Sequence, residues 1–230
     1  MGPQFPAATL RFLRALKRHN DREWFRARRE EYDRVVRAPM VAVIERLAVD
    51  FGRFAPEMVA SPKTSLYRVY RDTRFSEDKR PLKTHVSASF RWRGLPKGES
   101  AGLYLEVDPR WIWMGGGFYA PASQHLVRIR AHISETYPAI RRIVRGATFT
   151  RVLGTLDGDR LTRQPRGYAA DDAASEFLKY KQFLAGREYP AGFATTPAFY
   201  PALLETFKAA MPLIRFLNEP LLDDSGPATR

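Results

Sequence analysis

The period of the hydrophobic pattern changes twice along this chain, and that change most constrains its fold. Apolar residues recur about every 3.6 positions within residues 10–54, which predicts helices. Over residues 66–117 the apolar and aromatic residues form short runs separated by turn residues, which predicts strands. Helical spacing returns after residue 121 and is clearest over 197–217. Because helices and strands do not alternate, the pattern favours an α+β fold with a mainly antiparallel sheet.

We expect the strands to come from two regions, about 66–117 and 148–190, and to pack against N- and C-terminal helices. The Asp108-Pro109 step predicts an antiparallel hairpin within the first region. In the strand before this turn, alternate residues share a face. One face carries Leu103, Leu105 and Val107, and the other carries Gly102, Tyr104 and Glu106.

Local signals predict several boundaries. Asn20 or Asp21 can cap a helix, and a helix is expected to kink or restart at Pro39. A strand is expected over 148–153 and a helix around 172–181. Residues 1–222 are expected to form a single domain, followed by a flexible tail over 223–230.

Composition limits the possible classes of protein. The chain has 230 residues, 44% of them hydrophobic, which is enough to build a core. It contains no cysteine, which excludes disulfides, thiol nucleophiles and cysteine-based metal sites. The sequence has no apolar run of about 20 residues and no secretory signal pattern, so we expect a cytoplasmic protein without a membrane partner. Oligomeric state is left open by these observations.

The positive charge is concentrated in one segment. The chain carries a formal net charge of +13, and residues 61–98 hold ten basic residues against three acidic ones. A localised basic segment of this kind is typical of proteins that bind phosphate. An anionic small molecule is therefore a possible partner, and nucleic acid is a second possibility.

The densest part of this segment is YRVYRDTRFSEDKRPLKTH, residues 67–85. Its arginines have forked N–H donors, which can pair with two oxygens of a carboxylate or phosphate. If Asp72 and Asp78 pair with neighbouring bases, the segment is an internal salt-bridge network. Because the acids are outnumbered, several cations remain that could form an anion site. The predicted ligand-binding residues here are Arg71, Arg74, Lys79 and Lys83, with Tyr70 beside them.

Two other segments can contribute to the same kind of site. The glycines of GGGFYAP precede a predicted helix, and the backbone amides of Gly116 and Gly117 could bind an anion. Tight turns are the alternative explanation of such glycines. The loop LTRQPRGY adds Arg163 and Arg166, which could equally belong to an ordinary exposed connection.

The sequence offers few catalytic groups. It contains no Walker loop, GxGxxG, GxSxG or HExxH motif. His125 and His132 lie two turns apart on one predicted helix, about 10 Å, so we predict no metal site and no cofactor. His85 and Asp72 are the candidate catalytic residues, because each lies in the basic segment and could transfer a proton.

Four segments together resemble a known family. LRFLRALKRHNDREWF, RVYRDTRFSEDKRPLKTH, GGGFYAP with HLVRIR, and LTRQPRGY occur in the order found in a bacterial family of uncharacterised proteins, domain of unknown function 2461. The resemblance implies a single-domain architecture over nearly the whole chain and no particular activity. It also implies that Arg130 belongs to a recurring motif. Leu82 stands where the family typically has tyrosine, and Thr162 where it has lysine.

Two functions are compatible with these observations. The first is a binding module in which arginine and lysine side chains line a pocket for a phosphate- or carboxylate-bearing ligand. The alternative is a metal-independent enzyme acting on an anionic substrate such as a nucleotide or nucleic acid, with His85 or Asp72 transferring the proton. A purely structural role of the charged segment is also open.

Overall fold

The fold is described from a computed structural model of the chain. The structure describes residues 2–74, 76–96, 98–169 and 171–222. The predicted tail at 223–230 lies outside these residues.

The strands form one five-stranded antiparallel sheet in the order β1-β2-β3-β4-β5, so each strand neighbours the next one in the chain. The strands are β1 Met58–Val59, β2 Val86–Trp92, β3 Gly102–Val107, β4 Trp111–Phe118 and β5 Phe183–Pro190. The predicted α+β class with a mainly antiparallel sheet is confirmed. The predicted faces of β3 are also confirmed, since its residues alternate between buried and half-buried.

Contacts between residues divide the chain into two compact units, and four of the strands, β2 to β5, have residues in both. Unit 1 comprises Met1–Phe90, Tyr104–Met114 and Glu188–Glu205. Unit 2 comprises Arg91–Leu103, Gly115–Arg187 and Thr206–Arg230.

In unit 1 the N-terminal helices follow the predicted boundaries. They are α1 Ala7–Arg18, α2 Arg22–Arg26, α3 Arg29–Tyr32, a π-helix over Asp33–Arg37 and α4 Ala38–Phe54. Asp21 caps α2 by accepting a hydrogen bond from the Trp24 amide at 2.7 Å. Pro39 lies in the first turn of α4, directly after the π-helix. Phe51 of α4 packs edge-on against Phe90 of β2, with ring centroids 5.4 Å apart.

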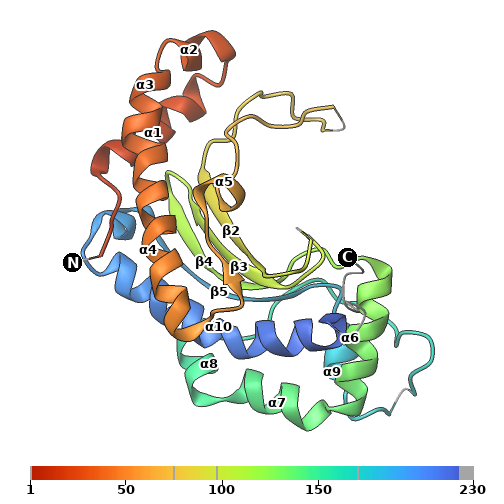
Figure 1. The fold of residues 1–230 in the computed structure, drawn as a ribbon. Coiled ribbons are helices and arrows are strands. Elements are labelled where there is room, and N and C mark those ends of the chain that lie inside the picture. The colour runs from red at the N-terminus through yellow and green to blue at the C-terminus, as the bar shows by residue number, and fades with distance from the viewer. Residues whose placement is uncertain (1, 75, 97, 170, 223–230) are drawn as a thin grey trace, which may run out of the picture. The chain divides into compact units, whose positions relative to one another are not determined.

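The charged segment forms an irregular antiparallel hairpin, which we call the arm (residues 66–85). Backbone hydrogen bonds join the Arg71 amide to the Pro81 carbonyl at 2.9 Å and the Lys83 amide to the Val69 carbonyl at 2.8 Å. The regular strand expected from residue 66 is replaced by isolated bridges at Leu66 and Tyr70. Pro81 has no amide hydrogen to donate and therefore interrupts the ladder of hydrogen bonds between the two sides of the hairpin. Figure 1 shows the arm, in yellow-orange, extending beyond α5 (Pro62–Ser65) and β2.

Unit 2 contains α6 Ser123–Glu135, α7 Tyr137–Arg145, α8 Ala147–Leu153, α9 Ser175–Leu178 and most of α10 Phe199–Leu222. The predicted strand over 148–153 was wrong, because this segment is α8. Its buried residues Phe149, Val152 and Leu153 have the i, i+3, i+4 spacing of a helix. The helix expected around 172–181 is limited to α9, and Tyr180 instead pairs with Arg160 in a β-bridge.

Candidate functional site

Three arginines of the arm, Arg71, Arg74 and Arg80, pair with acids of the same arm. Arg71 Nη1 lies 2.5 Å from Asp78 Oδ2. Arg74 contacts Asp72 through both Nε, at 3.0 Å, and Nη2, at 2.8 Å. Lys79 Nζ donates to the Thr73 carbonyl at 3.1 Å rather than to Asp78. These are the contacts that an internal salt-bridge network requires.

Asp78 is the centre of this network and has a second partner, Arg80, which the sequence pattern did not single out as a site residue. Arg80 Nη2 lies 2.6 Å from Asp78 Oδ2. Hydrogen bonds from Arg80, and then from Arg71, hold the pKa of Asp78 well below its usual value. Tyr70 packs edge-on against Phe25, with ring centroids 5.9 Å apart. A ligand-binding role of the arm residues stays a prediction.

A second group of polar and aromatic side chains lies at the base of the arm and on the half-buried faces of β3 and β4. We call it the sheet-face cluster, and it consists of Tyr67, Lys83, His85, Tyr104, Glu106 and Trp113. Lys83 Nζ lies 4.7 Å from the centre of the Tyr67 ring. The Tyr104 ring packs between Tyr67, at 6.3 Å, and Trp113, at 6.1 Å. These contacts bring together strands and loop residues that are up to 46 positions apart in sequence.

Glu106 contacts both His85 and Tyr104. Its side chain is 14% exposed, and its Oε1 lies 3.2 Å from Nδ1 of His85. Its Oε2 accepts a hydrogen bond from the Tyr104 hydroxyl at 2.5 Å. Burial, followed by the nearby Glu106 charge, raises the pKa of Tyr104, so this hydroxyl remains protonated and can donate.

Burial lowers the pKa of His85, while Glu106 opposes that change. The imidazole is 27% exposed and therefore still reaches solvent. Of the two predicted catalytic residues, His85 thus has a carboxylate partner. Asp72 pairs with Arg74, whose hydrogen bonds lower the pKa of Asp72.

In unit 2, Gly116 and Gly117 are placed by strand packing. A Cβ at Gly116 would lie 2.8 Å from the Gly102 carbonyl oxygen. Gly117 has a φ of 139°, and a Cβ there would lie 1.9 Å from the Phe183 carbonyl oxygen. Glycine is therefore required at this point of β4 by the close approach of β3 and β5, whatever its amides bind.

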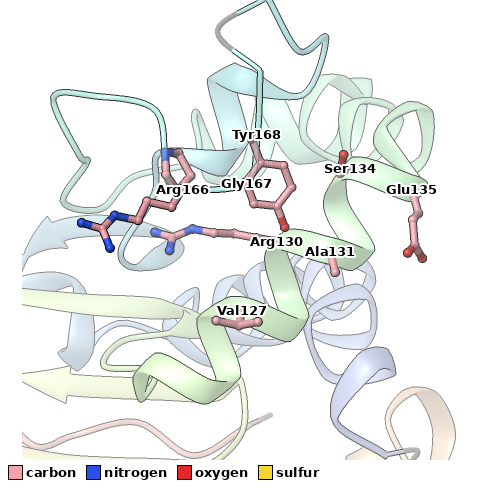
Figure 2. A pocket seen from close by; sticks show the side chains of 9 residues that line it. Val127, Arg130, Ala131, Ser134, Glu135, Arg166, Gly167 and Tyr168 are labelled. Carbon is pink, nitrogen blue, oxygen red and sulfur yellow. The ribbon is translucent and has the colours of Figure 1, made fainter.

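Unit 2 also contains a hollow of about 490 Å³, which we call the Arg130 hollow. It is lined by residues of α6 and of the loop before α9: Val127, Arg130, Ala131, Ser134, Glu135, Pro165, Arg166, Gly167 and Tyr168. Figure 2 shows the guanidinium groups of Arg130 and Arg166 extending toward the same side, with Tyr168 above α6 and Glu135 at the opposite end. Arg163 is exposed and is not part of this lining.

The fold holds Arg130 in place through backbone carbonyls. Its Nε donates to the Leu178 carbonyl at 2.8 Å, and its Nη2 donates to the Tyr180 carbonyl at 3.1 Å. Among the residues that the structure describes, no carboxylate lies within 4.0 Å of this guanidinium. Burial lowers the pKa of Arg130, and Tyr168 opposes this effect. Composition and spacing did not identify Arg130, which only the family resemblance had marked.

Neither a metal site nor a membrane-crossing helix is found in the described part of the chain. No group of three or more histidine or acidic side chains there could hold a metal ion. None of its helices is both long enough and apolar enough to cross a membrane.

Comparisons with known proteins bear on the family alone. No match was found among curated proteins or among solved structures. The model of a family described as "Conserved hypothetical protein (DUF2461)" matches residues 8–216, which is most of the chain. Because this match covers most of the chain, the chain belongs to the DUF2461 family.

Proposed function

We propose that this protein is a binding module for a small anionic ligand carrying a phosphate or carboxylate group, and that the Arg130 hollow binds it. The observation that carries the proposal is the placement of Arg130. Its guanidinium is half-buried, is fixed by two carbonyl oxygens and lines an open hollow.

An anion would compensate the charge of Arg130. Moving a cation out of water is costly unless an opposite charge or a set of hydrogen bonds replaces the lost solvation. Two carbonyl oxygens satisfy two of the five N–H donors of this guanidinium. Remaining donors form a fork that suits the paired oxygens of a carboxylate or phosphate. Arg166 supplies a second positive charge on the same side of the hollow (Figure 2).

The size and lining of the hollow favour a small molecule. Its volume of about 490 Å³ is within the range of roughly 300–1,000 Å³ found for ligand pockets. Val127, Ala131 and Pro165 provide an apolar surface, and Tyr168 offers an aromatic ring. Because Glu135 lies at the far end, the anionic group should bind at the arginine end (Figure 2).

Ligand-induced stabilisation tests the proposal. Pyrophosphate and citrate serve as probes in low-salt buffer, with thermal unfolding as the measurement. A probe present at a hundredfold excess over its Kd adds about 2.7 kcal/mol of stability. For a chain of this length, each kcal/mol raises Tm by roughly 2–4 °C. We expect at least one probe to raise Tm by several degrees, and the effect to decrease as sodium chloride is added.

Matched variants separate specific binding from general charge. Arg166 is exposed, so R166A should fold normally and lose most of the probe-induced shift. R141A removes an equally exposed arginine from α7, outside the hollow lining, and should retain it. Equal shifts in both variants, or no shift with either probe in the unmodified protein, would contradict binding at this site.

A second function has one specific observation in its favour. A metal-independent enzyme needs a group that can exchange a proton near neutral pH. Asp72 is exposed, paired with Arg74 and has a lowered pKa, so it stays ionised in that range. His85 is partly buried beside Glu106, an arrangement that orients an imidazole in many acid–base sites. We therefore propose His85 as the proton-transferring residue if the protein catalyses a reaction on an anionic substrate.

A further inference from the structure

The sheet-face cluster contains a nearly buried carboxylate that no lysine or arginine neutralises among the described residues. Glu106 instead contacts one imidazole and one phenol, through its two different oxygens. Tyr104 and Glu106 are two positions apart on β3, so their side chains lie on the same face. The tyrosine hydroxyl thereby fixes the carboxylate, and the carboxylate faces His85.

The contact between Glu106 and His85 gives the two imidazole nitrogens different roles. A carboxylate 3.2 Å from Nδ1 favours the tautomer that carries its proton on Nδ1. In that tautomer Nε2 has a free lone pair and can accept a proton. The same division of roles operates in catalytic triads, where an acid orients the histidine and stabilises its charged form. Such contacts are often loosely aligned before a substrate binds.

Four charged groups act on His85. Lys83 and Arg71 disfavour its protonation, and Glu106 and Asp108 favour it. Asp108 also contacts Arg110, at 3.3 Å, which leaves Glu106 as the acid that directly faces the ring. Together with burial, this balance keeps the imidazole neutral at neutral pH, which is the form that accepts a proton.

The surroundings of His85 also indicate what kind of substrate would fit. Lys83 is two residues from His85 and its charge acts on the imidazole, so it offers a positive charge for an anionic group. Tyr67, Tyr104 and Trp113 form an adjoining series of aromatic rings. Aromatic side chains of this kind stack against planar rings.

We propose that the sheet-face cluster is a hydrolytic site for negatively charged aryl esters, in which His85 is the catalytic base and Glu106 is its positioning residue. This inference rests on the second proposed function. In the step, Nε2 of His85 takes a proton from water while the water oxygen bonds to the acyl carbon or phosphorus. The bond to the leaving oxygen then breaks, and that oxygen receives the proton back from the imidazolium. No oxidant, reductant or further reactant is required.

Two probes distinguish the two kinds of ester. One is bis(4-nitrophenyl) phosphate, and the other is the mono-4-nitrophenyl ester of succinic acid. Both carry a negative charge and an aromatic ring, and both release coloured nitrophenolate. We expect the full-length protein to hydrolyse at least one of them faster than buffer does. H85A should reduce kcat/KM about a hundredfold, which is the lower end of typical acid–base contributions. H19A, which removes an exposed histidine of unit 1 outside the cluster, should retain full activity.

The role of Glu106 has a separate readout. E106Q keeps an oxygen facing His85 but removes the charge that favours its protonation. The midpoint of the rate–pH profile should therefore move to lower pH, by about one unit, and kcat should fall about tenfold. Y104F should give a smaller decrease in kcat, because the carboxylate loses its fixed hydrogen bond. A variant that was merely less well packed would lose activity without moving the midpoint.

Each outcome decides a different statement. If the unmodified protein hydrolyses neither ester, the inference is refuted and the second proposed function loses only this substrate class. If H85A hydrolyses the esters as fast as the unmodified protein, His85 is not the base, and both the inference and the second proposed function are refuted. If H85A is inactive but E106Q keeps the original pH midpoint, His85 remains the base and the role of Glu106 is refuted. Circular dichroism and thermal unfolding of every variant exclude loss of fold. For E106Q, nitrogen-15 NMR of the histidine side chains provides a second test, since the Nδ1–H tautomer should predominate in the unmodified protein and decrease in the variant.

Discussion

Asp50 shows how individual residues of unit 1 balance burial against charge. Its side chain is 7% exposed and accepts hydrogen bonds from Arg46 Nε at 2.9 Å and from the Tyr200 hydroxyl at 2.8 Å. Burial opposes ionisation of this carboxylate. The hydrogen bonds from Arg46 and Tyr200 outweigh that effect, so the pKa of Asp50 lies below its usual value.

Removing the buried hydroxyl should weaken this arrangement. Y200F deletes a hydrogen bond to a charged group and leaves the ring packing unchanged. We expect a loss of about 1–3 kcal/mol in the free energy of unfolding. Urea denaturation at pH 7 measures it, and Y189F, at a half-buried tyrosine for which the structure shows ring stacking on Phe193, is the control. A Y200F variant as stable as Y189F would show that the Asp50 contact contributes little.

Asp50 also predicts a pH dependence. A carboxylate whose pKa is lower in the folded state stabilises the protein above its unfolded pKa, which is about 3.9. That contribution is lost as pH falls through the unfolded pKa toward the folded one. The unmodified protein should therefore lose stability more steeply than D50N between about pH 5 and pH 2. Parallel stability curves for the two proteins over this range would contradict the assignment.

At the scale of elements, β4 depends on glycine because β3 and β5 approach it closely. G117A would place a methyl group 1.9 Å from the Phe183 carbonyl oxygen, at a φ of 139° that side chains rarely adopt. We expect a loss of more than about 2 kcal/mol in unfolding free energy, from strain and overpacking combined. G52A is the matched control. Nothing lies within 4 Å of a Cβ at Gly52 in α4, so alanine should stabilise that helix by about 0.5–1 kcal/mol. Equal effects would contradict the packing argument.

The sequence was sufficient for elements whose pattern is local. The alternation in β3 and the Asp108-Pro109 turn predicted the β3–β4 hairpin and its faces correctly. The prediction of a strand at 148–153 was wrong. The β-branched residues of this segment favour a strand, but Phe149, Val152 and Leu153 are buried at helical spacing and the segment forms α8. Tertiary packing therefore outweighs the local strand propensity of this segment.

Candidate sites were harder to predict because they combine distant segments. The sequence placed Glu106 and Tyr104 on one face of a strand, but only strand pairing brings His85 to them. Arg130 is one of several arginines in the sequence. Its role depends on the carbonyls of Leu178 and Tyr180, about fifty residues away, which no local pattern reveals.

For the whole molecule, the net charge of +13 has consequences that do not depend on any one site. Like charges repel one another in the folded state, and salt screens that repulsion. We expect Tm at pH 7 to rise when sodium chloride is increased from about 10 to about 200 mM. Thermal unfolding in the absence of any polyvalent anion measures this. A Tm that falls over this range would show that attractive pairs, such as those of the arm, dominate.

Nucleic acid as a partner stays a prediction, and the same charge defines how to test it. Binding that depends only on phosphate should weaken steeply with salt and should show little preference for sequence. Filter binding of a single-stranded oligonucleotide at two salt concentrations would measure this.

The central claim is that Arg130 and Arg166 bind an anion in the hollow of unit 2. The most direct measurement follows the side-chain Nε–H signals of the arginines by proton–nitrogen NMR while pyrophosphate is added. The Nε–H of Arg130 donates to the Leu178 carbonyl, which should protect it from exchange and make it visible. We predict a saturable shift at Arg130 and Arg166 that requires more pyrophosphate at higher salt. An unchanged Arg130 signal, or equal non-saturating shifts at all exposed arginines, would contradict the claim.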